Sequence, residues 1–193
     1  MIEAFLSSTV VVALAEIGDK TMLLAIVLAA RLKAPWAILA GILVATMANH
    51  ALAAFVGKEV AGLLQADWFR IAVALGFIAM AAWTLVPDKL DEDENTVRST
   101  GGAFMTTLVS FFLVEMGDKT QVATIALAAQ YQAVLSVAAG TTLGMMLANG
   151  PAVFLGEAIE RRISMKLTRT LAALLFLALG LWQLIRLFGS GLG

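Results

Sequence analysis

Long apolar segments follow one another along the chain, separated by short stretches rich in charged or turn-forming residues. A helix needs roughly 20 apolar residues to cross the hydrocarbon core of a bilayer, which is about 30 Å thick. This pattern predicts six membrane-spanning helices, at residues 5–30, 36–56, 69–86, 103–129, 133–155 and 171–188. The sequence therefore predicts an all-α integral membrane protein that crosses the bilayer several times.

Two polar stretches between the apolar segments are not expected to span the membrane. Residues 87–102 contain a run of Asp and Glu and are interpreted as an acidic cytoplasmic linker. Residues 157–169 mix charged and apolar positions and are interpreted as a short amphipathic helix on the cytoplasmic surface.

The chain contains an internal repeat at an offset of 99 positions. The hexad Glu16–Thr21 (Glu-Ile-Gly-Asp-Lys-Thr) falls without a gap on Glu115–Thr120 (Glu-Met-Gly-Asp-Lys-Thr), and the same offset pairs Trp83 with Trp182. Each half has three predicted helices, an odd number, so the second half must enter from the opposite side of the membrane. We expect two inverted-topology three-helix repeats, residues 1–86 and 103–193, joined by the acidic linker at 87–102.

Composition excludes several classes of protein. Apolar residues make up 61% of the chain and charged residues 14%, against about 25% charged in soluble domains, so a soluble enzyme is excluded. The absence of cysteine excludes disulfides, iron–sulfur clusters and thiolate zinc sites, and the single histidine, His50, excludes a multi-histidine metal cage. The net charge of −1 and the lack of a basic patch argue against nucleic acid as a partner. No resident cofactor is expected.

The distribution of Lys and Arg predicts the orientation of the chain. The loops after the first, third and fifth predicted helices hold eight, namely Arg31, Lys33, Lys89, Arg98, Arg161, Arg162, Lys166 and Arg169. The opposite side holds three, namely Lys58, Arg70 and Arg186. Because cytoplasmic loops carry an excess of Lys and Arg, we expect both termini outside the cytoplasm.

Each hexad places charges inside a predicted span. At 1.5 Å per residue, Glu16 and Glu115 lie about 17–18 Å along their helices, close to the middle of the bilayer. A charge there costs about 2.5–3.5 kcal/mol and is rarely retained without a function. On a continuous helix, a Glu would share a face with the Asp three positions later and pair with the Lys four positions later. Gly18 and Gly117 would allow either close approach of a neighbouring helix or a local break.

The candidate metal ligands are the four acidic residues of the hexads, Glu16, Asp19, Glu115 and Asp118. If the two helices face each other, these carboxylates converge, and in a medium of low dielectric constant they must bind protons or a cation. Oxygen ligands without thiolate suit Ca²⁺, Mn²⁺ and Mg²⁺ and disfavour Cu⁺ and Zn²⁺. With two charged lysines the cluster carries a net charge of −2, which one divalent cation or two protons neutralise. This arithmetic favours an exchanger of protons for a divalent cation. The alternative is that each Glu–Lys pair only neutralises itself and joins helices.

Further polar residues are candidate supporting residues. The two lysines serve charge balance or take part in the exchange cycle, and the two threonines offer hydroxyl oxygens. The polar residues of the second and fifth predicted helices are either ligands, or partners that orient a ligand, or polar groups satisfied within the bundle. A glutamine stands after the second hexad where the first half has Met22, and it is a candidate for distinguishing the two faces. The set comprises Lys20, Lys119, Thr21, Thr120, Asn49, His50, Asn149 and Gln121.

The duplicated Glu-x-Gly-Asp-Lys-Thr hexad, in a six-helix chain with an acidic middle loop, resembles the Gdt family of membrane Ca²⁺/Mn²⁺:H⁺ antiporters. The resemblance covers nearly the whole chain. It implies a compact bacterial member of the inner membrane that exports Mn²⁺, ahead of Ca²⁺, from the cytoplasm against proton entry. It also implies that the acidic residues of both hexads bind the ion.

Two other functions are compatible with parts of the pattern. Rings of carboxylates also select cations in channels, so an uncoupled divalent-cation channel or facilitator is the main alternative. The Gly-Asp pairs of the hexads superficially resemble the motif of intramembrane aspartyl proteases, but the charged residue two positions before each pair, Glu16 or Glu115, does not fit that motif.

Overall fold

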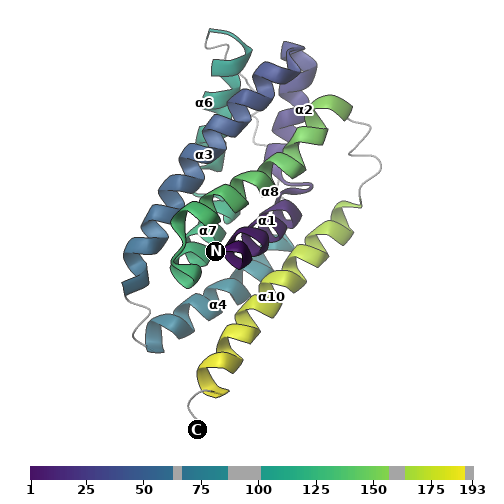
Figure 1. The fold of residues 1–193 in the computed structure, drawn as a ribbon. Coiled ribbons are helices and arrows are strands. Elements are labelled where there is room, and N and C mark those ends of the chain that lie inside the picture. Colours follow the sequence, from purple (N-terminus) through teal and green to yellow (C-terminus); the bar gives the residue numbers. More distant parts are fainter. Residues whose placement is uncertain (63–66, 87–100, 157–163, 190–193) are drawn as a thin grey trace.

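A computed structural model describes residues 1–62, 67–86, 101–156 and 164–189. These residues form eight helices and no strand (Figure 1). The helices are α1 (Ile2–Glu16), α2 (Lys20–Leu32), α3 (Pro35–Val60), α4 (Asp67–Thr84), α6 (Ala103–Glu115), α7 (Lys119–Tyr131), α8 (Val134–Leu155) and α10 (Met165–Gly189).

Four of these helices are long and apolar enough to cross a bilayer by themselves. They are α3, α4, α8 and α10, with a span of Lys166–Gly189 in the last, and they coincide with the second, third, fifth and sixth predicted spans. The predicted spans 5–30 and 103–129 differ from the structure, because each consists of two shorter helices with a break at the hexad. The expectation of one uninterrupted helix in each of these segments is therefore wrong.

Glycine makes both breaks possible. Gly18 has a φ of +84° and Gly117 a φ of +78°, a region that side chains with a Cβ rarely adopt. The next residue is extended in both halves, with φ and ψ of −84° and 171° at Asp19 and −78° and 169° at Asp118. Each aspartate then stands at the N-cap of the following helix, where a short acidic side chain is favoured. Of the two possibilities for these glycines, the structure shows the local break.

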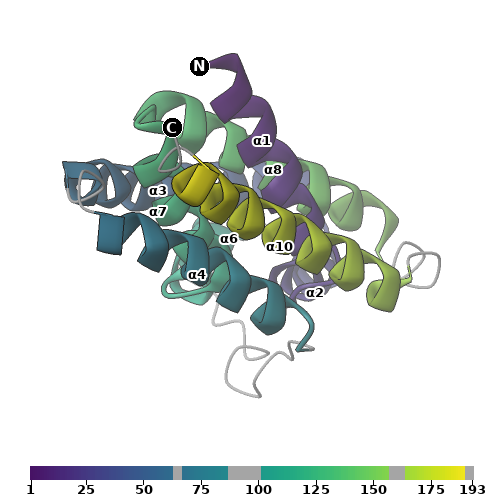
Figure 2. The ribbon, with the colours of Figure 1, turned by 90° about the horizontal axis from the view of Figure 1, so that it is seen from below.

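The repeat of the sequence is also a repeat of local structure. The ends of α1 and α6, and both ends of α2 and α7, lie 99 positions apart. The residues after α2 and α7, Lys33 and Gln132, both have a φ of +50°. Figure 1 shows that α3 and α8 run in opposite directions along the molecule, and Figure 2 shows the same for α4 and α10. The helices of the two halves interleave, because α1 packs on α8 and α6 packs on α3.

Close approach of backbones at glycine holds these interleaved helices together. A Cβ at Gly41 of α3 would lie 2.8 Å from the carbonyl oxygen of Phe104 on α6. A Cβ at Gly140 of α8 would collide in the same way with the carbonyl oxygen of Phe5 on α1. Both contacts join the halves, and each is the repeat counterpart of the other. Small residues allow this approach in membrane proteins, where packing and not the exclusion of water drives helix association.

The interior combines apolar core clusters with buried polar residues, and the surface exposes many large apolar side chains. The carboxylates of all four hexad acids are buried, as are several threonines, whereas large apolar side chains such as Leu113, at 62% exposed, and Ile185, at 70%, cover the helix surfaces. This distribution suits a lipid environment.

The two predicted polar stretches lie partly outside the described residues. Of the predicted acidic linker, residues 87–100 are outside. Of the predicted amphipathic helix at 157–169, residues 157–163 are outside. Residues 165–169 belong instead to the first turns of the long helix α10, so a separate surface helix ending at residue 169 is wrong for this part.

Candidate metal-binding site

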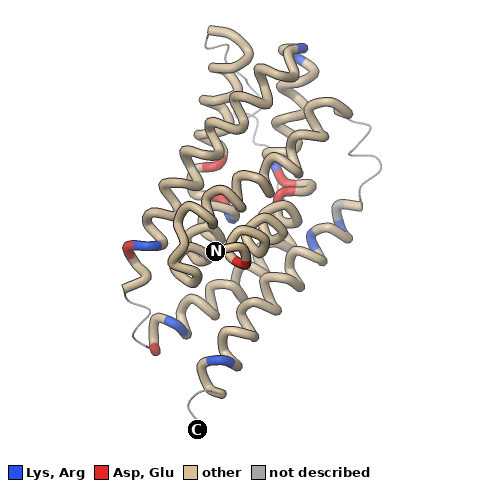
Figure 3. The backbone as a smooth tube through the Cα atoms, in the orientation of Figure 1, with Lys and Arg blue, Asp and Glu red and all other residues tan. Residues whose placement is uncertain are grey.

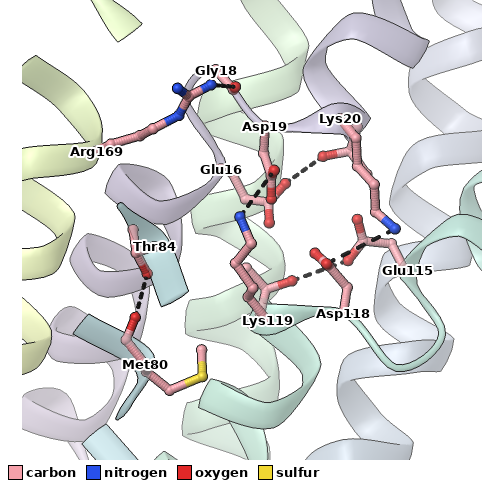
Figure 4. Close-up of polar contacts among 12 residues, drawn as sticks. Glu16, Gly18, Asp19, Lys20, Met80, Thr84, Glu115, Asp118, Lys119 and Arg169 are labelled. Carbon is pink, nitrogen blue, oxygen red and sulfur yellow. Dashed lines mark hydrogen bonds and ion pairs between the residues drawn. The ribbon is translucent and has the colours of Figure 1, made fainter. Parts of the chain in front are cut away.

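The two helix breaks meet inside the bundle. Figure 3 shows that acidic and basic residues of the chain come together midway along the molecule, away from the charged residues near its ends. In Figure 4 the acidic and basic side chains of both hexads point toward one another from the two breaks. Glu16 is 0% exposed, Glu115 1%, Asp19 3% and Asp118 6%. Residues 99 positions apart in sequence thus share one buried polar centre, as repeat symmetry predicts.

Three of the four carboxylates form a compact group of possible metal ligands. One carboxylate oxygen from each of Glu16, Asp19 and Asp118 lies within 4.8 Å of the others. Glu16 is the last residue of α1, and each aspartate begins the helix after its break. Glu115 lies in the same centre (Figure 4), but outside this group among the described residues. The group draws on both halves, so neither half alone would hold it.

The lysines pair across the halves. Nζ of Lys119 lies 3.4 Å from Oδ1 of Asp19, and Nζ of Lys20 lies 3.9 Å from Oδ1 of Asp118 (Figure 4). These ion pairs run across the halves, from the lysine of one hexad to the aspartate of the other, because the break changes the direction of the chain between Glu and Lys in each hexad. Glu16 and Asp19 lie close together, as expected, although the break and not a continuous helix face brings them together.

The threonines of the hexads hold the glutamates. Oγ1 of Thr21 donates a short hydrogen bond to Oε2 of Glu16, and Oγ1 of Thr120 donates to Oε2 of Glu115 at 3.1 Å. Within the described residues, the other oxygen of each glutamate, Oε1, accepts no hydrogen bond. Oδ2 of Asp19 likewise has no hydrogen bond within the described residues. Buried acceptors without a donor are costly, and a cation or a proton would satisfy them.

The remaining predicted residues are divided between the site and the bundle around it. Nδ2 of Asn49 donates to the carbonyl oxygen of Phe112 at 3.0 Å and so joins α3 to α6 one turn before the second break. Nδ2 of Asn149 donates within its own helix, to Met145 at 3.2 Å. His50 is buried, its ring nitrogens have no hydrogen bond within the described residues, and it is not in the carboxylate group.

Gln121 provides a hydrogen-bond acceptor for a backbone group of the second break. Its Oε1 accepts a hydrogen bond from the backbone N–H of Gly117 at 2.7 Å. The counterpart in the first half is Met22, which has no acceptor of this strength. The two breaks therefore satisfy their backbone groups differently. That Gln121 also distinguishes the inward and outward faces stays a prediction.

One residue near the site was not among the sequence candidates. Nη2 of Arg169, on α10, donates to the carbonyl oxygen of Gly18 at 3.5 Å (Figure 4). The sequence analysis placed Arg169 in a surface helix. A signal was present, because the offset of 99 positions aligns Arg169 with Arg70.

The site has the chemistry of a divalent-cation site that also binds protons. Four carboxylates and two ammonium groups leave a net charge of −2 when all are ionised, in a centre from which water is largely excluded. Oxygen donors of this kind are ligands for Ca²⁺, Mn²⁺ and Mg²⁺. Carboxylate oxygens are also acceptors for protons.

Comparison with known proteins agrees with this chemistry. Residues 4–92 and 103–190 match the family described as "Divalent cation/proton antiporter GDT1". A Vibrio cholerae protein named "Putative manganese exporter" is 49% identical over 175 residues, which cover 90% of this chain and 86% of that protein. A GDT1-like protein of Synechocystis is 29% identical over 91% of this chain and 94% of its own length. GDT1-like protein 4 of Oryza sativa subsp. indica is 30% identical over 94% of this chain and 73% of its own. No solved structure matches.

Proposed function

This chain belongs to the GDT1 family of divalent cation/proton antiporters, and from that premise we propose that it exports Mn²⁺ from the cytoplasm in exchange for protons. Membership makes the protein a membrane transporter of divalent cations and not an enzyme. The resemblance to intramembrane aspartyl proteases therefore has no functional meaning. Mn²⁺ is placed ahead of Ca²⁺ because a relative with 49% identity is named as a manganese exporter.

One observation carries the proposal. Carboxylate oxygens of Glu16, Asp19 and Asp118, contributed by both halves, lie within 4.8 Å of one another in a buried centre. A divalent cation held there would join the two breaks. We assign metal binding to these three residues and to Glu115, whose buried Oε1 accepts no hydrogen bond among the described residues.

The lysines compensate two of the four carboxylate charges of the site. In the conformation described, Lys119 and Lys20 approach Asp19 and Asp118 in crossed pairs. When Mn²⁺ binds, its two charges neutralise the −2 that remains after the two ammonium groups have compensated two of the four carboxylates. Two protons replace the two charges of the metal when it leaves, because a cluster of net charge −2 is too costly to leave uncompensated in this medium. This requirement couples metal movement to proton movement.

Alternating access follows from the proposed inverted repeat of six spans, each broken helix counted as one. Three features support a two-fold relation between the halves. The Lys–Asp pairs are reciprocal, the glycine contacts of α3 with α6 and of α8 with α1 are reciprocal, and Phe77 of α4 stacks on its own counterpart Phe176 of α10, with ring centroids 6.4 Å apart. Reciprocal contacts of this kind are the mark of a two-fold axis. Broken helices at the repeat interface are the usual substrate sites of such transporters.

The proposed location is the bacterial inner membrane, with both termini outside the cytoplasm. The excess of Lys and Arg in the loops after the first, third and fifth spans supports this orientation. We also propose domain boundaries from the sequence repeat, with repeats at 1–86 and 103–193 and a cytoplasmic linker at 87–102.

The test is transport by purified protein in liposomes that enclose a pH-sensitive dye. A Mn²⁺ gradient should drive proton movement in the opposite direction, and a pH gradient should drive Mn²⁺ uptake against its own gradient. Metal flux that ignores the pH gradient would instead support an uncoupled channel or facilitator. A panel of Mn²⁺, Ca²⁺ and Mg²⁺ at equal concentration establishes the preference among the ions.

The matched control for this assay is Glu59→Gln, which removes an exposed carboxylate far from the hexads in sequence. It should leave exchange unchanged, whereas Asp19→Asn should abolish it while the protein still inserts and purifies. Retained coupled exchange in Asp19→Asn and Asp118→Asn would contradict the assignment of the site.

A further inference from the structure

The two breaks differ in what covers them. Gly18 is buried, and its carbonyl oxygen accepts the hydrogen bond from Arg169 of α10 at 3.5 Å (Figure 4). Gly117 is exposed, and the preceding Met116 is 57% exposed. The first break is therefore closed by a side chain from α10, whereas the second break is open.

Arg70 is the repeat counterpart of Arg169, since the two lie 99 positions apart near the beginnings of α4 and α10. Repeat symmetry would place Arg70 on the carbonyl oxygen of Gly117. Among the described residues it makes no such contact. Its Nη1 instead lies 3.6 Å from Oδ1 of Asp67, one turn away on its own helix, and its side chain is 37% exposed. Arg70 is thus withdrawn to the surface while Arg169 is engaged.

The packing of the helices shows the same asymmetry. Helices α4 and α10 pack against each other and bear their stacked pair, Phe77 and Phe176, between them. On the rest of the bundle, α10 packs on α1, but α4 packs on α7. Symmetry would require α4 to pack on α6 as α10 packs on α1, and the described residues show no contact of that extent between α4 and α6. The α4–α10 pair therefore contacts α1 through α10 and α7 through α4, without a contact of comparable extent on α6 among the described residues.

We propose that Arg169 is a positioning residue that holds the first break closed in this conformation, and that Arg70 closes the second break in the opposite conformation of the transport cycle. The inference rests on the proposed alternating access. A break leaves backbone carbonyls without helical partners, and a guanidinium group supplies the missing donor with a charge-assisted hydrogen bond. In inverted-repeat transporters the opposite state arises when the two repeats exchange roles, so the α4–α10 pair would move from α1 to α6.

The proposed orientation of the chain assigns each arginine to one side of the membrane. Arg169 lies near the cytoplasmic end of α10 and Arg70 near the outer end of α4. In the conformation described, the site is then closed toward the cytoplasm by Arg169 and open toward the outside at Met116 and Gly117. Arg70 would close the outer path when the site opens inward.

Labelling of single cysteines tests the proposal, because the chain contains no cysteine of its own. Ile17→Cys and Met116→Cys place a thiol at equivalent positions of the two breaks. Each is introduced into the full chain, reconstituted in nanodiscs without metal, and treated with a water-soluble maleimide. In the otherwise unchanged protein, the thiol at position 116 should react faster than the thiol at position 17.

The arginine variants should move the two rates in opposite directions. Arg169→Ala should raise the rate at position 17 by up to about tenfold, the factor that the loss of one charge-assisted hydrogen bond produces in an equilibrium. The same variant should lower the rate at position 116, because the conformation that exposes it loses population. Arg70→Ala should do the reverse, with a slower reaction at position 17. Arg169→Lys, which retains a cationic donor, should restore most of the original difference.

A merely structural role would give a different result. If Arg169→Ala raises the rate at position 17 and leaves position 116 unchanged, Arg169 only packs against the first break and the proposal is wrong. Unchanged rates at both positions also overturn it. If Arg169→Ala does not fold, two other variants test the proposal. Arg169→Gln should raise the rate at position 17 and lower it at position 116, and Arg70→Ala should have the opposite effect on both rates. Labelling requires no transport, so failure of this inference is separable from failure of the proposed exchange.

Discussion

The two hexads have nearly the same sequence and the same backbone conformation, yet they contribute differently to the site. Glu16 belongs to the group of three close carboxylates, and its counterpart Glu115 does not. The side chain of Lys119 is 5% exposed and its Nζ lies 3.4 Å from Asp19, whereas the side chain of Lys20 is 19% exposed and its Nζ lies 3.9 Å from Asp118. A repeated sequence thus reproduces a local fold, but the packing around each copy decides how close its charges come.

The largest expected effect tests what the two halves share. Asp19→Asn and Asp118→Asn should each abolish Mn²⁺/H⁺ exchange, with Mn²⁺ affinity reduced by more than about 100-fold, beyond the 10–100-fold typical of residues that only support a ligand. Each aspartate begins a helix at a break and belongs to the close group of ligands. Isothermal titration with Mn²⁺ and the liposome assay measure the two losses. Near-normal binding in one of the two variants would show that the site lies in a single half.

The next effect tests how the halves differ. Glu16→Gln should weaken Mn²⁺ binding by about 100-fold, and Glu115→Gln by about 10-fold, since only Glu16 lies in the close group. The glutamine side chain keeps the size of the original and can still accept the hydrogen bond from the hexad threonine. The same titration gives both affinities in parallel. Equal losses in the two variants would mean that the glutamates contribute alike despite their positions.

The lysines should differ in their effect on stability. Lys119→Met leaves Asp19 in a buried site without its ammonium partner, and it should lower the stability of the metal-free protein by about 3 kcal/mol. Lys20→Met should cost about 1 kcal/mol, because Lys20 is partly exposed and its ion pair is longer. Thermal unfolding in detergent, with and without Mn²⁺, measures the effect. Mn²⁺ should restore most of the loss in both variants, and a greater loss in Lys20→Met would reverse the proposed difference.

The smallest effect tests the contacts that interleave the halves. Gly41→Ala and Gly140→Ala should each lower stability by about 1–3 kcal/mol, because a Cβ at either position meets backbone of the facing helix. Gly76→Ala on α4 is the matched control, since no atom lies within 4 Å of its added Cβ. It should be neutral or stabilising by up to about 1 kcal/mol. A loss at only one of Gly41 and Gly140 would show that the two contacts are not equivalent.

Sequence reasoning predicted the spans well and the interior of the site less well. The apolar runs correspond to α3, α4, α8 and α10 within a few residues at most ends, because lipid demands long uninterrupted apolar surfaces. The spacing argument assumed a continuous helix through Gly18 and Gly117. It correctly predicted that Glu16 and Asp19 lie close together, but it did not predict the Lys–Asp pairs between the halves. Arg169 was missed because its partner is a backbone carbonyl, which the side-chain pattern does not identify, although the repeat aligns Arg169 with Arg70.

By itself the sequence determined that this is a polytopic α-helical membrane protein with a repeated charged hexad, and it predicted that the six charges lie at mid-membrane depth. Hydrophobicity, helical rise and the cost of burying charge act on every residue locally, so their consequences can be predicted from the sequence. Only the tertiary structure decided that the lysines cross between the halves, that three carboxylates form the close group, and that one break is covered and the other open. Those outcomes depend on distances between residues about a hundred positions apart, which local rules do not constrain.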